Sequence, residues 1–199
     1  MLHMPNFLKT SLAVALMSLV VVGCSEQSST SNSQQNAAST DALNSQQQAV
    51  VDRITEAYLS IQSQLASDSI DQVPAQLQAI RDSAQSLQDQ AGQADNSKLK
   101  TQGSAIAKAA DFQAKDVKQA RNKLVDLSDS VIKLVQAHPP SDAAASELYL
   151  AECPMVDNGL WLQPQQQVTN PYMGSRMLQC GSIQQTIKDS DEAGDGASS

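Results

Sequence analysis

Four stretches between residues 51 and 138 place apolar residues at alternating steps of three and four, the spacing that puts side chains on one face of an α-helix. They cover residues 51–65, 71–91, 98–110 and 117–138. Ser67-Asp68-Ser69 separates the first two, and Pro139-Pro140 ends the last. Since the connections are short, the pattern predicts an all-α fold: an antiparallel bundle of about four helices.

The apolar faces of these helices are narrow and rich in alanine, and aromatic residues make up only 3% of the chain. A bundle of this kind has a thin core for its length. We therefore expect extra stabilisation from a crosslink, a metal ion or a partner.

Residues 1–23 are typical of an export signal. Lys9 precedes an apolar run, Ser11 to Val22, that is too short to span a membrane. Val21-Val22-Gly23-Cys24 resembles the lipobox of bacterial lipoprotein signals, which implies cleavage before Cys24 and lipidation of its thiol. The alternative is an ordinary signal peptide, but the branched Val21 stands where the ordinary peptidase prefers a small residue.

The residue after the lipidated cysteine bears on localisation. It is Ser25 rather than aspartate, which in lipoproteins of Gram-negative bacteria favours the outer membrane. We expect a lipid anchor there, with the domain facing the periplasm.

Composition divides the rest of the chain into three parts. Residues 24–48 hold the anchor and then Ser, Thr, Asn, Gln and Ala with almost no large apolar side chains, so we expect a disordered tether. Residues 49–187 form the expected domain, and residues 188–199 an acidic disordered tail.

Charge and missing motifs exclude two classes of function. Removing the signal takes away one of 13 basic residues and none of the 21 acidic ones, so the net charge goes from −8 to −9. A nucleic-acid partner is not expected at this charge. The sequence has no phosphate-binding glycine loop, no HExxH and no CxxC, and His138 is the only histidine after the signal, so we expect no enzyme.

Soft metal ligands gather in one segment, residues 153–180. It holds every cysteine and methionine after the anchor, and His138 lies just upstream; the candidate ligands are Cys153, Met155, Met173, Met177, Cys180 and His138. Thiolate, thioether and imidazole ligands suit Cu(I) or another soft ion. If the segment after Pro171 is helical, Met173, Met177 and Cys180 point to one side.

Plainer roles remain open for the same residues. Cys153 and Cys180 could form a disulfide, as cysteine pairs in oxidising compartments usually do. The methionines could fill a core around Trp161 and Tyr172. His138 could be a helix-terminal residue that interacts with the last carbonyls. A redox pair is a third possibility, although the missing CxxC disfavours it.

Several fixed spacings within this segment resemble a known signature. Cys153-Pro154-Met155, Trp161-Leu162, Asn170-Pro171-Tyr172, Gly174, Met177-Leu178 and Cys180-Gly181 look like the motif of an uncharacterised domain linked to heavy-metal efflux. In that family a helical region precedes the motif, and the domain occurs alone or appended to copper and silver efflux adaptor subunits. Met173 and Val156 depart from the residues common there.

Taken together, residues and resemblance predict a periplasm-facing lipoprotein that binds a soft metal ion, Cu(I) first, and buffers it or passes it to an efflux system. An efflux adaptor or another envelope protein is the expected partner, beside the membrane. The alternative is a structural or interaction module of the envelope, stapled by a Cys153–Cys180 disulfide, in which metal has no role.

Overall fold

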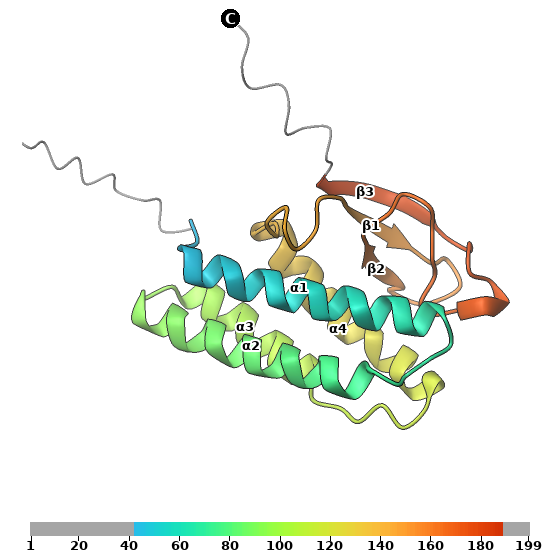
Figure 1. Cartoon of the computed structure of the whole chain (residues 1–199), viewed down its shortest axis with the longest axis horizontal. Coiled ribbons are helices and arrows are strands. Elements are labelled where there is room, and N and C mark those ends of the chain that lie inside the picture. The colour runs from blue at the N-terminus through green and yellow to red at the C-terminus, as the bar shows by residue number, and fades with distance from the viewer. Residues whose placement is uncertain (1–41, 189–199) are drawn as a thin grey trace, which may run out of the picture. The chain divides into compact units, whose positions relative to one another are not determined.

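A computed structural model describes residues 42–188 of the chain (Figure 1). The expected signal, Cys24, residues 24–41 of the expected tether and the tail after Lys188 lie outside the described residues. Among the residues described, none of the helices combines the length and the apolar character that crossing a membrane requires.

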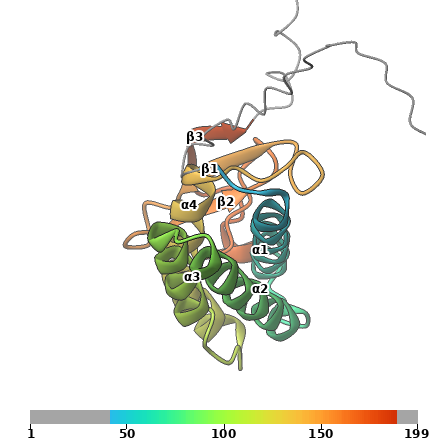
Figure 2. The same ribbon diagram turned by 90° about the vertical axis from the view of Figure 1, so that its left-hand side faces the viewer.

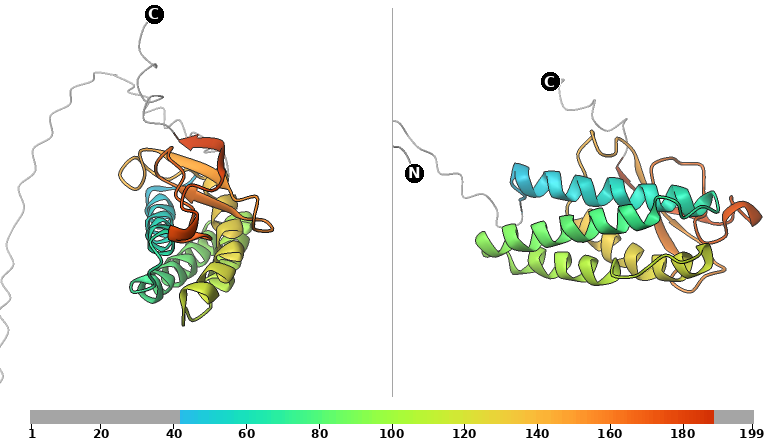
Figure 3. Two further views of the ribbon diagram at one scale, coloured as in Figure 1. Left: turned by 90° about the vertical axis from the view of Figure 1, so that its right-hand side faces the viewer. Right: turned by 60° about the horizontal axis from the view of Figure 1, so that its bottom comes forward.

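The four expected helices are present. They are α1 (Ser45–Ala66), α2 (Val73–Gln93), α3 (Ser97–Ala109) and α4 (Val117–Ala137). Each packs against the next, and α4 also contacts α1, so the bundle closes on itself. Figure 3 shows α1, α2 and α3 side by side along the long direction of the domain.

Capping side chains set where α1, α3 and α4 begin. Asn44 and Gln47 form a capping box: the Gln47 N–H donates to Asn44 Oδ1 at 2.9 Å, and the Asn44 N–H donates to Gln47 Oε1 at 3.0 Å. This reciprocal pair satisfies two backbone donors and starts α1 at Ser45, ahead of Val51, where the helical pattern was expected to begin. Residues 45–48, predicted to belong to the tether, are therefore helical. Asp116 caps α4 in a similar way, accepting from the Gln119 N–H at 2.7 Å.

The C-terminal third corrects the all-α prediction. It forms a three-stranded antiparallel sheet of β1 (Leu148–Glu152), β2 (Leu160–Gln163) and β3 (Ser182–Lys188), in the order β2-β1-β3. β2 packs on both α1 and α4, so the sheet covers that side of the bundle (Figure 2). Between β2 and β3 lies only a short 3₁₀ helix, η1 (Gly174–Arg176), so the helical arrangement considered for Met173, Met177 and Cys180 is wrong.

Pairing between the strands is regular on one side of β1 and irregular on the other. β1 and β2 pair without interruption from Tyr149–Gln163 to Glu152–Leu160. β3 pairs with β1 through two register shifts, so one residue of β3 is left out at each. Bulges twist an edge strand and limit its pairing with other chains.

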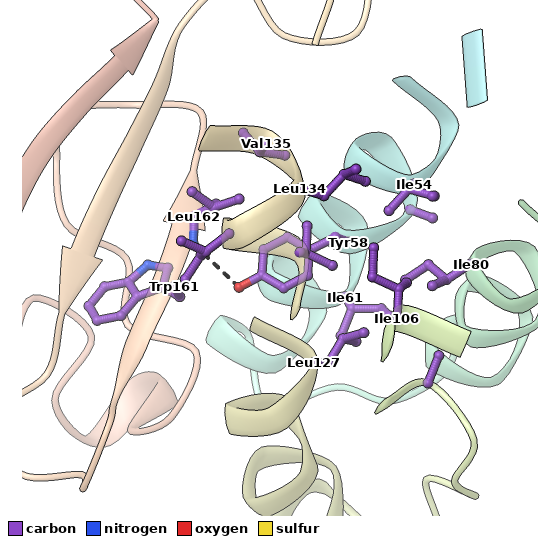
Figure 4. Close-up of a cluster of buried hydrophobic side chains, with 14 of the residues drawn as sticks. Ile54, Tyr58, Ile61, Ile80, Ile106, Leu127, Leu134, Val135, Trp161 and Leu162 are labelled. Carbon is purple, nitrogen blue, oxygen red and sulfur yellow. Dashed lines mark hydrogen bonds between the residues drawn. The ribbon is translucent and has the colours of Figure 1, made fainter. Parts of the chain in front are cut away.

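One hydrophobic core joins the helices to the sheet (Figure 4). Tyr58 of α1 is fully buried and points toward β2, where its hydroxyl accepts a hydrogen bond from the Leu162 N–H at 3.3 Å. The same hydroxyl pairs with Ser128 of α4 at 2.7 Å. Trp161 is directed to the other side of β2, as alternation along a strand requires, and is also fully buried.

Candidate metal centre

The two cysteines of the domain meet at one end of the sheet. Cys153 directly follows β1, and Cys180 lies two residues before β3. Since Glu152 pairs with Ser182, the strand register brings these flanking residues together. Cys153 acts electrostatically on the Cys180 thiol, so the two side chains are neighbours, and both are free thiols.

The two thiols differ in exposure. Cys153 is fully buried, whereas Cys180 is partly exposed. Burial raises the pKa of the Cys180 thiol, and the neighbouring Cys153 raises this pKa further. Cys180 is therefore predominantly a neutral thiol at pH 7, and a metal ion that binds its thiolate must displace a proton.

Each cysteine belongs to a tight turn that also contains an exposed methionine. The Val156 N–H donates to the Cys153 carbonyl at 3.2 Å, and the Cys180 N–H donates to the Met177 carbonyl at 3.0 Å. Met155 is 64% exposed and Met177 45% exposed. Two thioethers thus lie on the turns beside the thiol pair, on side chains with several freely rotating bonds.

Asn170 fastens the turn that carries Cys180. Its side chain is fully buried and donates to the Cys180 carbonyl at 2.6 Å. Its Oδ1 accepts from the Tyr172 N–H at 2.8 Å and the Met173 N–H at 3.0 Å. The Asn170 N–H also donates to the Leu178 carbonyl at 2.7 Å. One side chain and its backbone therefore fix both ends of the loop that leads to Cys180.

Gly181 and Trp161 bring the two cysteine turns close together. Gly181 has φ +130°, and a Cβ there would lie 2.5 Å from the Glu152 carbonyl oxygen and 2.9 Å from Trp161 Cη2. Trp161 in turn meets Tyr172 edge to face, with ring centroids 6.0 Å apart. Only glycine allows this approach, which keeps Cys180 beside Cys153.

Met173 lines a different part of the surface. It borders a hollow of about 660 Å³ between α4 and η1, and neither cysteine lines that hollow; the other lining residues are Asp68, Val117, Lys118, Arg121, Asn122, Tyr172 and Arg176. The described geometry thus leaves Met173 outside the thiol pair, although it was expected among the ligands.

The hollow is closed on one side by an ion pair. Arg121 donates to Asp68 at 2.5 Å, to the Leu65 carbonyl at 2.6 Å and to the Pro171 carbonyl at 2.8 Å. Hydrogen bonds from Ser175 and then from Arg121 hold the pKa of Asp68 below its usual value. Gly174, with φ +57°, leaves room for this contact, because a Cβ there would lie 2.0 Å from Arg121 Nη2.

His138 lies at the opposite end of the sheet. It is the C-cap residue of α4, and its N–H donates to the Leu134 carbonyl, which agrees with a helix-terminal position. Lys188 donates to the Pro140 carbonyl at 3.0 Å and pairs with Leu148 at the start of β1. Cys153 follows the other end of β1. The distance along the strand from Leu148 to Cys153 is roughly 16 Å at the usual rise per residue.

The thiol pair is the part of the predicted ligand set that the structure assembles. Within residues 42–188 no three His, Cys, Asp or Glu side chains converge on one point. A metal ion at this end of the sheet would have the two thiolates as its charged protein ligands, with the thioethers of Met155 and Met177 on the adjoining turns. That set suits soft monovalent ions rather than calcium or magnesium.

The sequence pattern indicates both cysteines as ligands but not the residues that position them. Asn170 and Gly181 occur in the quoted motif, and an Asn-Pro step and a glycine after a cysteine indicate turn chemistry. Asn170 binds residues farther along the same loop, and Gly181 approaches Glu152 and Trp161, so the local sequence pattern does not indicate what either residue holds.

Comparison with known proteins adds no family. No protein-family model matches the chain, and neither curated proteins nor solved structures give a significant match.

Proposed function

We propose that this chain is a non-enzymatic envelope lipoprotein, anchored at Cys24, whose domain binds Cu(I) or another soft monovalent ion. Cys153 and Cys180 supply the two thiolates. Met155 and Met177 supply thioethers that exchange readily, which suits buffering or transfer to an efflux system. The observation that carries the proposal is that the register of β1 and β3 places two free thiols side by side, with an exposed methionine in each adjoining turn.

Two further observations support it. Asn170 and Gly181 fix the backbone around the thiols, so the ligands are positioned before a metal arrives. The resemblance of residues 153–181 to a domain linked to heavy-metal efflux includes both cysteines, Met155 and Met177. Met173 and His138, which lie elsewhere, are left out of the proposed site.

The test is an anaerobic Cu(I) titration against a competing chelator. The protein is the chain without residues 1–23, carrying Cys24→Ser so that the anchor thiol does not compete. We expect one tightly bound Cu(I) per reduced chain and loss of this binding in Cys153→Ser and in Cys180→Ser. Unchanged Cu(I) affinity in both serine variants would contradict the proposal.

Methionine variants separate the thioethers inside the site from the one outside it. Met155→Leu combined with Met177→Leu should weaken Cu(I) binding or speed its loss to the chelator, since leucine keeps the volume but not the sulfur. Met173→Leu is the matched control and should leave both quantities unchanged, because Met173 lines the hollow beside Arg121. Equal effects of the two sets would remove the thioethers from the proposal.

A structural role is the second candidate, and the burial of Cys153 favours it. A Cys153–Cys180 disulfide would tie the end of β1 to the start of β3. In the loop-entropy model it would stabilise the domain by roughly 3 to 4 kcal/mol. Alkylation of the native protein purified without reductant distinguishes the two: the structural role requires that neither cysteine be labelled.

A further inference from the structure

The two sulfurs of the thiol pair are not equivalent toward a reagent from solution. Cys153 is fully buried. Cys180 is partly exposed, and it ends a turn in which Met177 and Leu178 are 45% and 38% exposed. A molecule approaching this end of the sheet therefore reaches the Cys180 sulfur first.

A bond between the two sulfurs requires little rearrangement. Both thiols are free, and they lie next to the paired residues Glu152 and Ser182 at the same end of the sheet. The backbone on both sides is held by the Glu152–Ser182 pairing and by the bond from Asn170 to the Cys180 carbonyl. Closing the pair therefore moves two side chains rather than two strands, which is the condition for an unstrained bridge.

From this asymmetry we infer that the pair is a redox gate on the metal site, in which Cys180 reacts first with an external disulfide and Cys153 closes the bridge. The Cys180 thiolate attacks one sulfur of the external disulfide, whose S–S bond breaks and releases one thiolate. The Cys153 thiolate then attacks the Cys180 sulfur and displaces the second. The pair loses two electrons and two protons, and the external disulfide is reduced to two thiols.

The redox gate rests on the proposed function, because the effect of oxidation would be on metal binding. The bridged form has no thiolate to offer a metal ion, whereas a bound soft ion occupies both sulfurs and blocks the first attack. The metal-binding role and the structural role then belong to two oxidation states of the same pair of cysteines. The reduced pair binds the metal ion. The oxidised pair releases the metal ion and links β1 to β3 through a disulfide.

The order of attack is tested with glutathione disulfide as the external disulfide. Reduced protein carrying Cys24→Ser is incubated with it, and intact masses are followed with time. The unaltered pair should lose two hydrogens and carry no lasting adduct. Cys153→Ser should gain one glutathionyl group and keep it, while Cys180→Ser should stay unmodified over the same period. Equal modification of the two variants, or a lasting adduct on the unaltered pair, would overturn the inference.

A second measurement does not depend on the variants folding. A limiting amount of iodoacetamide is added to the reduced, unaltered pair, and the labelled peptide is identified; Cys180 should be labelled several-fold more than Cys153. Equal labelling contradicts the order.

Cu(I) titrations of the reduced and bridged forms test the gate itself. A reduced form that binds Cu(I) but does not close into a bridge with glutathione disulfide overturns the gate and leaves the proposed function standing. Equal Cu(I) binding by the reduced and bridged forms overturns both, because the bridged form has no thiolate. If the reduced form binds no Cu(I), the proposed function is overturned, and the gate with it. The intact masses from the glutathione disulfide experiment still decide which sulfur reacts first.

Discussion

The helical bundle and the C-terminal sheet are held together in different ways. The bundle depends on many similar contacts, in which apolar residues repeat along each helix and bury a shared face. The sheet region depends on a few single contacts, among them the Asn170 hydrogen bonds and the close approach at Gly181. Damage to the bundle should therefore lower stability gradually, whereas damage to one sheet contact should also separate the thiols.

Asn170→Ala should have the largest effect. It removes the acceptor for two backbone N–H groups and the donor to the Cys180 carbonyl, all buried or partly buried. Leaving these groups unpaired should cost about 3 to 5 kcal/mol in the free energy of unfolding, measured in urea. Native-state alkylation of both cysteines should rise as well.

Asn122→Ala on the exposed face of α4 is the matched control and should change neither quantity. If Asn170→Ala costs less than about 1 kcal/mol and the thiols stay protected, the Asn170 side chain is not what holds the cysteine turn.

Leu124→Ala tests the other side of the comparison. Leu124 is fully buried in α4, and its truncation should cost about 3 kcal/mol through lost apolar burial and the remaining cavity. Because its neighbours repeat the same kind of contact, the thiol pair should keep its alkylation pattern and, at low temperature where the variant stays folded, its Cu(I) affinity. A loss of Cu(I) affinity as large as in Asn170→Ala would show that the two regions are not separable.

The same difference explains what could be predicted from the sequence. Helix positions followed from a pattern that repeats over several turns, so one atypical residue such as Gly103 did not hide α3. The strands lacked such a pattern. β1 is buried at four successive residues and so does not alternate, and the two register shifts interrupt the alternation of β3.

The sequence predicts the kind of ligands in the candidate site but not which residues belong to it. Cysteines and methionines identified a soft-metal segment, and nothing local distinguished Met155 from Met173. The structure separates them because Met173 follows the Asn170 turn toward Arg121, while Met155 stays beside Cys153. His138 is near Cys153 in sequence, but β1 carries the chain away from His138 before Cys153 is reached.

Two glycine variants should give effects of opposite sign. Gly181→Ala introduces a Cβ 2.5 Å from the Glu152 carbonyl oxygen at a φ of +130°, and should cost about 2 kcal/mol and weaken the contact between the thiols. Gly92→Ala in α2 meets nothing within 4 Å and should stabilise the protein by about 0.5 to 1 kcal/mol. Thermal unfolding of both variants checks the signs. A neutral Gly181→Ala would mean that the strands can move apart without cost.

The smallest effect concerns alkaline pH and the junction between bundle and sheet. Burial raises the pKa of Tyr58 to about 12, and burial raises the pKa of Tyr172 in the same direction. The folded state therefore keeps protons that the unfolded chain loses near pH 10, so stability present below pH 10 is lost as the pH rises toward 12. Tyr58→Phe removes one of these protons, and its free energy of unfolding should fall less steeply over that range, by up to about 1.4 kcal/mol per pH unit. Urea unfolding at several pH values measures the slope independently of the starting stability. An unchanged slope would mean that the Tyr58 hydroxyl ionises in the folded protein as readily as in the unfolded chain, and that the junction opens before the rest of the domain.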